Sequence, residues 1–146
     1  MTVNSLTLGS SGAVTINPLQ TLTLDSGGLL ALTGNAGVSG GFLTTTGNRE
    51  LIVHALADLS ITSTILGTTG GLTKSGAGVL TLGAPSYYSG VTTVNQGTLR
   101  ANAGTGTIFF NNDFLLQGGS FDLNGTSQVL NRLRTDTATP QNANLI

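Results

Sequence analysis

His54 is the side chain best suited to acid–base chemistry, because the chain has one histidine and imidazole titrates near neutral pH. It lies in the segment ELIVHALADL, with Glu50 and Asp58 as the nearest acidic residues in sequence. A catalytic or metal-binding histidine needs partners on its own side of the chain. The alternation of Leu51 and Val53 places these apolar residues inward and His54 outward. We therefore interpret His54 as a surface residue without a catalytic role.

Carboxylates could serve polysaccharide cleavage, which needs two paired acids, or a Ca²⁺ site, which needs a cluster of oxygen ligands. The six acidic residues are Asp25, Glu50, Asp58, Asp113, Asp122 and Asp136. None stands in a D-x-D or other paired arrangement, although a repetitive fold could bring Asp113 and Asp122 onto neighbouring faces. We predict solvated carboxylates in turns, with no metal site and no catalytic residues. A polysaccharide-active enzyme is kept as a third, remote alternative.

Glycine-rich stretches raise two further classes of ligand. The segment TGGLTKSGAG has the glycines of a Ca²⁺-binding nonapeptide repeat but lacks its aspartate. Gly76-Ala77-Gly78 lacks the third glycine, the strand-to-helix setting and the following acid that a dinucleotide-binding loop requires. We expect a turn at this position and no cofactor.

Two pairs of adjacent aromatic residues, Tyr87-Tyr88 and Phe109-Phe110, could contact a ligand. In a strand, one member of each pair points inward and the other outward. Outward aromatic rings are used as platforms by carbohydrate-binding proteins, so Tyr87 is a candidate for a weak sugar contact. An aromatic ring stacked over a turn or capping an inner layer needs no ligand, and this is the favoured interpretation.

Composition excludes several classes of partner. The net charge is −1 and the five basic residues are scattered, which argues against nucleic acid as a partner. The chain has no cysteine, so it has neither disulfides nor thiolate metal sites. No stretch is long enough to cross a bilayer, and the start, MTVNSLTLGSSG, lacks the blocks of a secretory signal. The chain is therefore either cytosolic or a piece of something longer.

The elements that position these residues are short strands. The pattern Gly-x-Φ-x-Φ, where Φ is apolar, recurs along the chain, and further alternating runs lie between its copies. The copies begin at Gly12, Gly28, Gly78 and Gly119, with a looser one at Gly97. Period-two alternation over four to six residues, bounded by Gly, Asn, Ser or Thr, predicts strands with one buried face. We find no helical periodicity.

These strands could form an antiparallel sandwich or a solenoid of stacked coils. A sandwich protects its edges with charged residues or proline, yet charged residues make up 8% of this chain. The outward positions carry Thr, Ser, Asn and Gln, which can stack on copies of themselves between parallel strands. We predict an all-β solenoid of about six or seven coils, each of about 20 to 25 residues. The coils span residues 1–133, and residues 134–146 form a terminal strand or a loose tail.

Residues 70–100 resemble a known family, the autotransporter-associated β-strand repeat, also called the passenger-associated transport repeat, of bacterial surface proteins. The matching blocks are Gly71-Leu72-Thr73-Lys74-Ser75-Gly76-Ala77-Gly78, Leu80-Thr81-Leu82, Tyr88-Ser89-Gly90, Thr92-Thr93-Val94-Asn95 and Gly97-Thr98-Leu99. Pro85 and Val91 depart from the pattern, which often has Asn and Gly there, and neither departure affects the alternation. The resemblance implies a right-handed parallel β-helix in an exported passenger region, located extracellularly or on the bacterial surface. It implies a stalk or scaffold without catalytic residues.

Assembly into an extracellular filament is the alternative function. The end of a solenoid exposes unpaired backbone groups, and the sequence offers no amphipathic helix or charged strand to cover them. A first strand containing Thr2, Val3, Leu6 and Leu8 could stack on the last coil of another copy. Such head-to-tail contact does not close and would yield a filament. The expected partners are therefore neighbouring coils of the same or a parent chain, or further copies in a homo-oligomer. We expect no membrane insertion of this segment.

Overall fold

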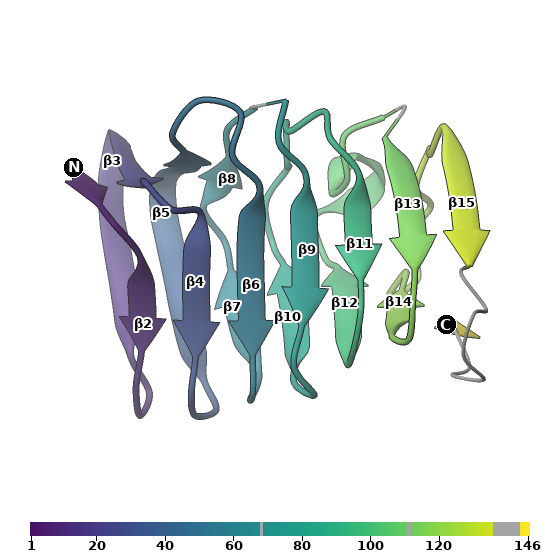
Figure 1. Ribbon diagram of the computed structural model, residues 1–146, viewed down its shortest axis with the longest axis horizontal. Helices are drawn as coiled ribbons and strands as arrows, with labels where there is room; N and C mark the ends of the chain where they lie inside the picture. Colours follow the sequence, from purple (N-terminus) through teal and green to yellow (C-terminus); the bar gives the residue numbers. More distant parts are fainter. Residues whose placement is uncertain (68, 111, 136–143) are drawn as a thin grey trace.

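The computed structural model describes residues 1–67, 69–110, 112–135 and 144–146. Their strands form two parallel sheets (Figure 1). One sheet contains β2 (Leu6–Leu8), β4 (Gly28–Ala31), β6 (Leu51–Ala55), β9 (Leu72–Ser75), β11 (Thr92–Val94), β13 (Asp113–Leu116) and β15 (Arg132–Thr135) in that order. The other contains β1 (Thr2–Val3), β3 (Ala13–Leu24), β5 (Ala36–Thr45), β7 (Leu59–Ile61), β10 (Val79–Leu82), β12 (Thr98–Ala101), β14 (Ser120–Asp122) and β16 (Asn144–Leu145), with β8 (Thr64–Ile65) paired to β5.

The chain winds as a right-handed parallel β-helix of about six turns, which confirms the predicted fold. In Figure 1 the sheet from β2 to β15 lies in front with its arrows pointing down, the other sheet lies behind, and the chain advances from left to right. Paired residues are 19 to 24 positions apart, as in Asp113↔Arg132 and Leu29↔Val53. Every strand pair among the described residues is parallel, so the antiparallel sandwich is excluded.

A third side of the coil was not expected from the sequence. It arises because β3 and β5 bend. The register of β3 with β5 shifts between Ile16 and Thr21, and Leu19 lies at the bend with a φ of 64°. Beyond the bend, β1 pairs with β3 on one side and β8 pairs with β5 on the other. An isolated bridge, Ile65↔Ser86, extends this side, and the following turn carries the 3₁₀ helix η1 (Gly104–Gly106).

The core consists of columns of side chains that stack from turn to turn. Leu80 lies between Leu59 and Leu99 in register, and Phe121 follows Leu99. All four are buried, and Phe121 stacks on Phe114 of the other sheet with ring centroids 4.3 Å apart. Burial of one leucine side chain stabilises a fold by about 2 kcal/mol. Each column therefore ties a turn to both of its neighbours.

The described C-terminal residues still form strands of the solenoid. β15 continues the strand pattern past Leu133 to Thr135 and pairs with β13, and β16 pairs with β14. The predicted tail of 134–146 falls largely on residues 136–143, which lie outside the described residues. The division at residue 133 therefore stays a prediction.

Candidate functional site: a polar junction in the core and an aromatic hollow on the surface

A lysine lies inside the core. Lys74 on β9 occupies an inward position between Val53 and Val94 of the neighbouring turns, and its side chain is fully buried. Its Nζ donates hydrogen bonds to the backbone carbonyl oxygens of Ser75 (2.9 Å), Gly76 (2.6 Å) and Gln96 (3.1 Å). An ammonium group has three N–H donors, so all three are used.

The three carbonyl groups belong to two successive turns of the solenoid. Ser75 and Gly76 begin the bend between β9 and β10, whereas Gln96 lies in the bend between β11 and β12. The main chain adds a parallel link, because Asn95 N donates to Lys74 O at 2.8 Å. Lys74 therefore joins two bends that stack on each other.

Burial changes the proton affinity of this group. Desolvation lowers the pKa of Lys74 from 10.5 to about 8, and the nearby carboxylate of Asp58 partly opposes the shift. Asp58 itself accepts a hydrogen bond from Val79 N at 2.9 Å. The junction is thus a buried cation held by uncharged carbonyl groups, with one carboxylate nearby.

A second polar junction lies on the other side of the same turn. The hydroxyl groups of Tyr88 and Thr92 are 2.8 Å apart and both residues are buried. Asn112 Nδ2 donates to Tyr88 O at 2.8 Å, which links this turn to the next. Burial raises the pKa of the Tyr88 hydroxyl above its ordinary value of 10.0. The hydroxyl groups of Ser63 and Ser86, in contrast, are buried and have no hydrogen-bond partner among the residues that the structure describes.

In the structure, each candidate catalytic residue contacts a different side chain. His54 faces outward, and its Nδ1 lies 2.8 Å from Ser75 Oγ on the next turn. Glu50 accepts a hydrogen bond from Thr73 Oγ1. Each of these side chains binds a hydroxyl group of the neighbouring strand, which is the arrangement of a surface ladder.

Two further carboxylates pair with arginines of adjacent turns. Asp113 lies 2.6 Å from Arg132, and Asp122 lies 2.6 Å from Arg100. These hydrogen bonds hold the pKa of both carboxyl groups below the usual range. Among the described residues, no group of three or more His, Asp or Glu side chains could hold a metal ion. These acids therefore link turns of the solenoid.

The pair Tyr87-Tyr88 divides between surface and core, although neither residue lies in a strand: Tyr88 is buried, whereas Tyr87 is 49% exposed. The pair Phe109-Phe110 does not divide in this way, because Phe109 is only partly buried and Phe110 is exposed. Tyr87 meets Phe109 with ring centroids 6.0 Å apart, and Phe109 meets Phe110 at 4.6 Å. The rings line a surface hollow of about 280 Å³ together with Pro85, Ile108 and Val129. The sugar contact proposed for Tyr87 stays a prediction.

The candidate assembly strand lies at the first edge of both sheets. Thr2 and Val3 pair with β3, and Leu6 and Leu8 pair with β4. Val3 and Leu6 are only partly buried, whereas Leu8 is buried. Assembly through this strand stays a prediction.

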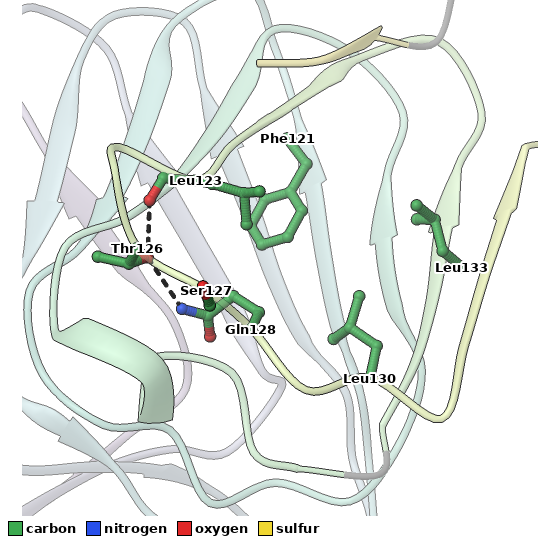
Figure 2. Close-up of a pocket in the computed structure, with 7 residues that line it drawn as sticks. All are labelled: Phe121, Leu123, Thr126, Ser127, Gln128, Leu130 and Leu133. Atoms are coloured by element: carbon green, nitrogen blue, oxygen red, sulfur yellow. Dashed lines mark hydrogen bonds between the residues drawn. The ribbon is translucent and has the colours of Figure 1, made fainter.

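At the other end, the described residues leave a hollow of about 310 Å³ in the last turn (Figure 2). Phe121, Leu123, Leu130 and Leu133 form its apolar wall. Gln128 Nε2 donates to Thr126 Oγ1 and closes part of its polar side. The two ends of the solenoid thus both carry incompletely buried aliphatic side chains.

Sequence reasoning did not single out Lys74 or its junction. The signal was present, since the alternation of Leu72 and Lys74 places the lysine on the inward face. No pattern in the sequence marks which carbonyl groups the ammonium would meet.

Residues 72–101 match the family model of the Passenger-associated-transport-repeat. Searches of the curated proteins and of the solved structures gave no match. Among the described residues, no helix has the length and apolar character needed to cross a membrane. The matched residues are the ones that form β9 to β12 and contain Lys74, Tyr88 and Thr92. Residues 72–101 are therefore similar to the passenger-associated transport repeat, in agreement with the resemblance seen in residues 70–100.

Proposed function

We propose that this chain is a structural, non-enzymatic segment of an autotransporter-type passenger region, which acts as a stalk or scaffold outside the bacterial cell. The observation that carries this proposal is the position of the matched repeat. Residues 72–101 form the middle of the solenoid, and their strands pair with a turn on either side. A repeat that is stabilised by its neighbours supplies length and stiffness without chemistry of its own.

Surface display tests this function. The chain is placed between an epitope tag and the membrane anchor of a bacterial display carrier, and antibody labelling of intact cells is compared with protease resistance. Leu80→Asp puts a carboxylate into the fully buried column and should abolish both signals, because an unpaired buried charge unfolds the turn. Thr81→Asp changes the adjacent, outward residue and should retain both. Equal display and resistance in the two variants would contradict the proposal.

End-to-end assembly is a second candidate, and the burial pattern favours it. The partly buried hydrophobic residues that pack against the core all lie in the first or last turns of the solenoid: Val3, Leu6, Val14, Leu123 and Leu130. Within the described residues, the edges of β2 and β15 have a strand partner on one side only. Stacking of one copy on another would pair these edges and bury the aliphatic side chains.

Sedimentation velocity and electron microscopy of the purified chain test assembly. The mean mass should rise with concentration, and Leu6→Lys should keep the chain monomeric because it places a charge in the stacking layer. Ile52→Lys, at an outward position of β6 that is 44% exposed, is the matched control and should assemble like the parent. A parent chain that stays monomeric at all concentrations would remove this candidate and leave the structural role intact.

A further inference from the structure

Three successive turns contribute side chains to the aromatic hollow. Pro85 and Tyr87 come from the segment between β10 and β11, Phe109 and Phe110 from the segment between β12 and β13, and Val129 from the segment between β14 and β15. The hollow therefore extends along the solenoid axis. It lies on the third side, beyond the isolated bridge Ile65↔Ser86, where the strand pairing of that side ends.

The core does not account for this cluster. Phe110 is 58% and Val129 is 60% exposed, and Tyr87 is half exposed. The outward positions of β9 and β11, in contrast, carry Thr and Ser side chains. Exposed aromatic rings that meet in one hollow mark a binding surface, since scattered single hydrophobic residues need no explanation but a patch does.

The chemistry of the lining restricts the ligand. None of the lining residues carries a charge, so the hollow offers nothing to an ionic ligand. Aromatic faces pack against the C–H faces of a pyranose ring. Tyr87 and Thr105 are the lining residues with a hydroxyl group, which can exchange hydrogen bonds with sugar hydroxyls. A volume of about 280 Å³ is slightly below the roughly 300–1,000 Å³ of small-molecule sites. It suits one ring of a longer molecule.

The direction of the hollow agrees with a linear polysaccharide. Successive turns are separated by the strand spacing of about 4.8 Å, and successive units of an extended glycan advance by a similar length. We propose that Tyr87, Phe109 and Phe110 form a binding site for a neutral polysaccharide that lies along the solenoid axis with one ring in the hollow. This contact goes beyond the structural role and is independent of it.

Binding is tested with the purified chain and three neutral probes, cellohexaose, maltohexaose and N-acetylchitohexaose. NMR titration should move the signals of Tyr87, Phe109 and Phe110 with at least one probe. Tyr87→Ala and Phe110→Ala should each weaken that binding about tenfold, as expected for the loss of one stacked ring. Tyr87→Phe keeps the ring and should bind within about threefold of the parent. Ile52→Ser, an exposed apolar residue on another side, is the matched control and should bind like the parent.

Circular dichroism of each variant checks that the solenoid is folded, which is expected because the substituted side chains are exposed. The proposal is overturned if none of the three probes binds, or if binding survives both alanine substitutions. It is also overturned if these substitutions abolish self-association of the chain, since the hollow would then serve a protein contact. None of these outcomes affects the surface-display test of the structural role.

Discussion

The buried ammonium group of Lys74 replaces an aliphatic side chain in a core column, and its energetics have two opposing parts. Desolvation of an ion costs several kcal/mol. Hydrogen bonds from a charged donor contribute about 1.5–3 kcal/mol each, and Lys74 makes three of them. The lowered pKa of Lys74 means that desolvation outweighs these bonds for the charged form. The hydrogen bonds therefore link the two turns but offset only part of the cost of burying the ammonium group.

Lys74→Met tests this balance, because methionine fills a similar volume without a donor. Three carbonyl groups are then left without their partner at about 1–3 kcal/mol each. This loss exceeds the desolvation cost that disappears, so the free energy of unfolding should fall by about 2 kcal/mol. Equilibrium urea unfolding measures the change. Ser86→Ala is the control in the same core, where removal of an unpartnered hydroxyl should leave stability unchanged or raise it by about 1 kcal/mol. A Met variant as stable as the parent would show that relief of the desolvation cost fully offsets the loss of the carbonyl contacts.

The shifted pKa values predict how stability depends on pH. Lys74 has a pKa of about 8 in the folded chain and an ordinary value of 10.5. Between these values the unfolded chain binds one more proton, so the free energy of unfolding rises with pH by up to about 1.4 kcal/mol per unit. Tyr88 acts in the opposite direction above pH 10.0, because only the unfolded chain then releases its proton.

Urea unfolding across this range should therefore reach its maximum stability near pH 10. Lys74→Met should remove the rise, and Tyr88→Phe should remove the fall at higher pH. Stability that decreases steadily from pH 8 upward in the parent would contradict the assignment of Lys74, and stability that does not fall above pH 10 would contradict that of Tyr88.

At the scale of elements, the bends between strands determine how closely the turns approach. Gly76 has a φ of 79°, and a Cβ atom at this position would overlap the carbonyl oxygen of Ala55 on the preceding turn. The same bend supplies two of the carbonyl groups that Lys74 binds. Gly76 is therefore needed both for its own conformation and for the contact between turns.

Gly76→Ala should lower the free energy of unfolding by about 3 kcal/mol, from left-handed strain and from the overlap. Gly47→Ala is a matched control, because Gly47 has a φ of 60° but no atom within 4 Å of the added Cβ. It should cost only the strain, about 1 kcal/mol. Thermal unfolding of the two variants separates the backbone strain from the overlap with the preceding turn. Equal losses of stability would show that the overlap does not contribute to the effect of Gly76→Ala.

The strands were predictable from the sequence because a strand with one buried face requires apolar residues at every second position. Residues such as Leu80 and Leu82 alternate with outward threonine or valine, and burial of one face requires this period. The bend at Leu19 was not predictable, because a leucine at positive φ has no signature in composition. The meeting of Tyr87 with Phe109 also depends on the length of a turn, which period-two alternation does not determine. Sequence thus specifies which face each residue occupies better than which neighbour it meets.

For the whole molecule, stability depends on contacts between neighbouring turns. Leu80 packs between two turns, whereas Leu6 has a strand partner only at Leu29. In such a one-dimensional array, an inner turn is stabilised by two interfaces and an end turn by one. Opening should therefore begin at the ends and reach residues 72–101, in the middle of the solenoid, last.

Amide hydrogen exchange tests this gradient. Protection should be highest in β7 to β12 and lowest in β1 and β2, because the inner strands open only when neighbouring turns have separated. Leu80→Ala should lower stability by about 3 kcal/mol and reduce protection in both adjacent turns. Leu6→Ala should cost about 1 kcal/mol and affect the first turns alone. The same experiment addresses assembly, because stacking of copies would raise the protection of β2 as the protein concentration increases.

Uniform protection in a dilute sample would contradict the gradient. It would mean that the solenoid unfolds as one unit and that its ends are no less stable than its centre.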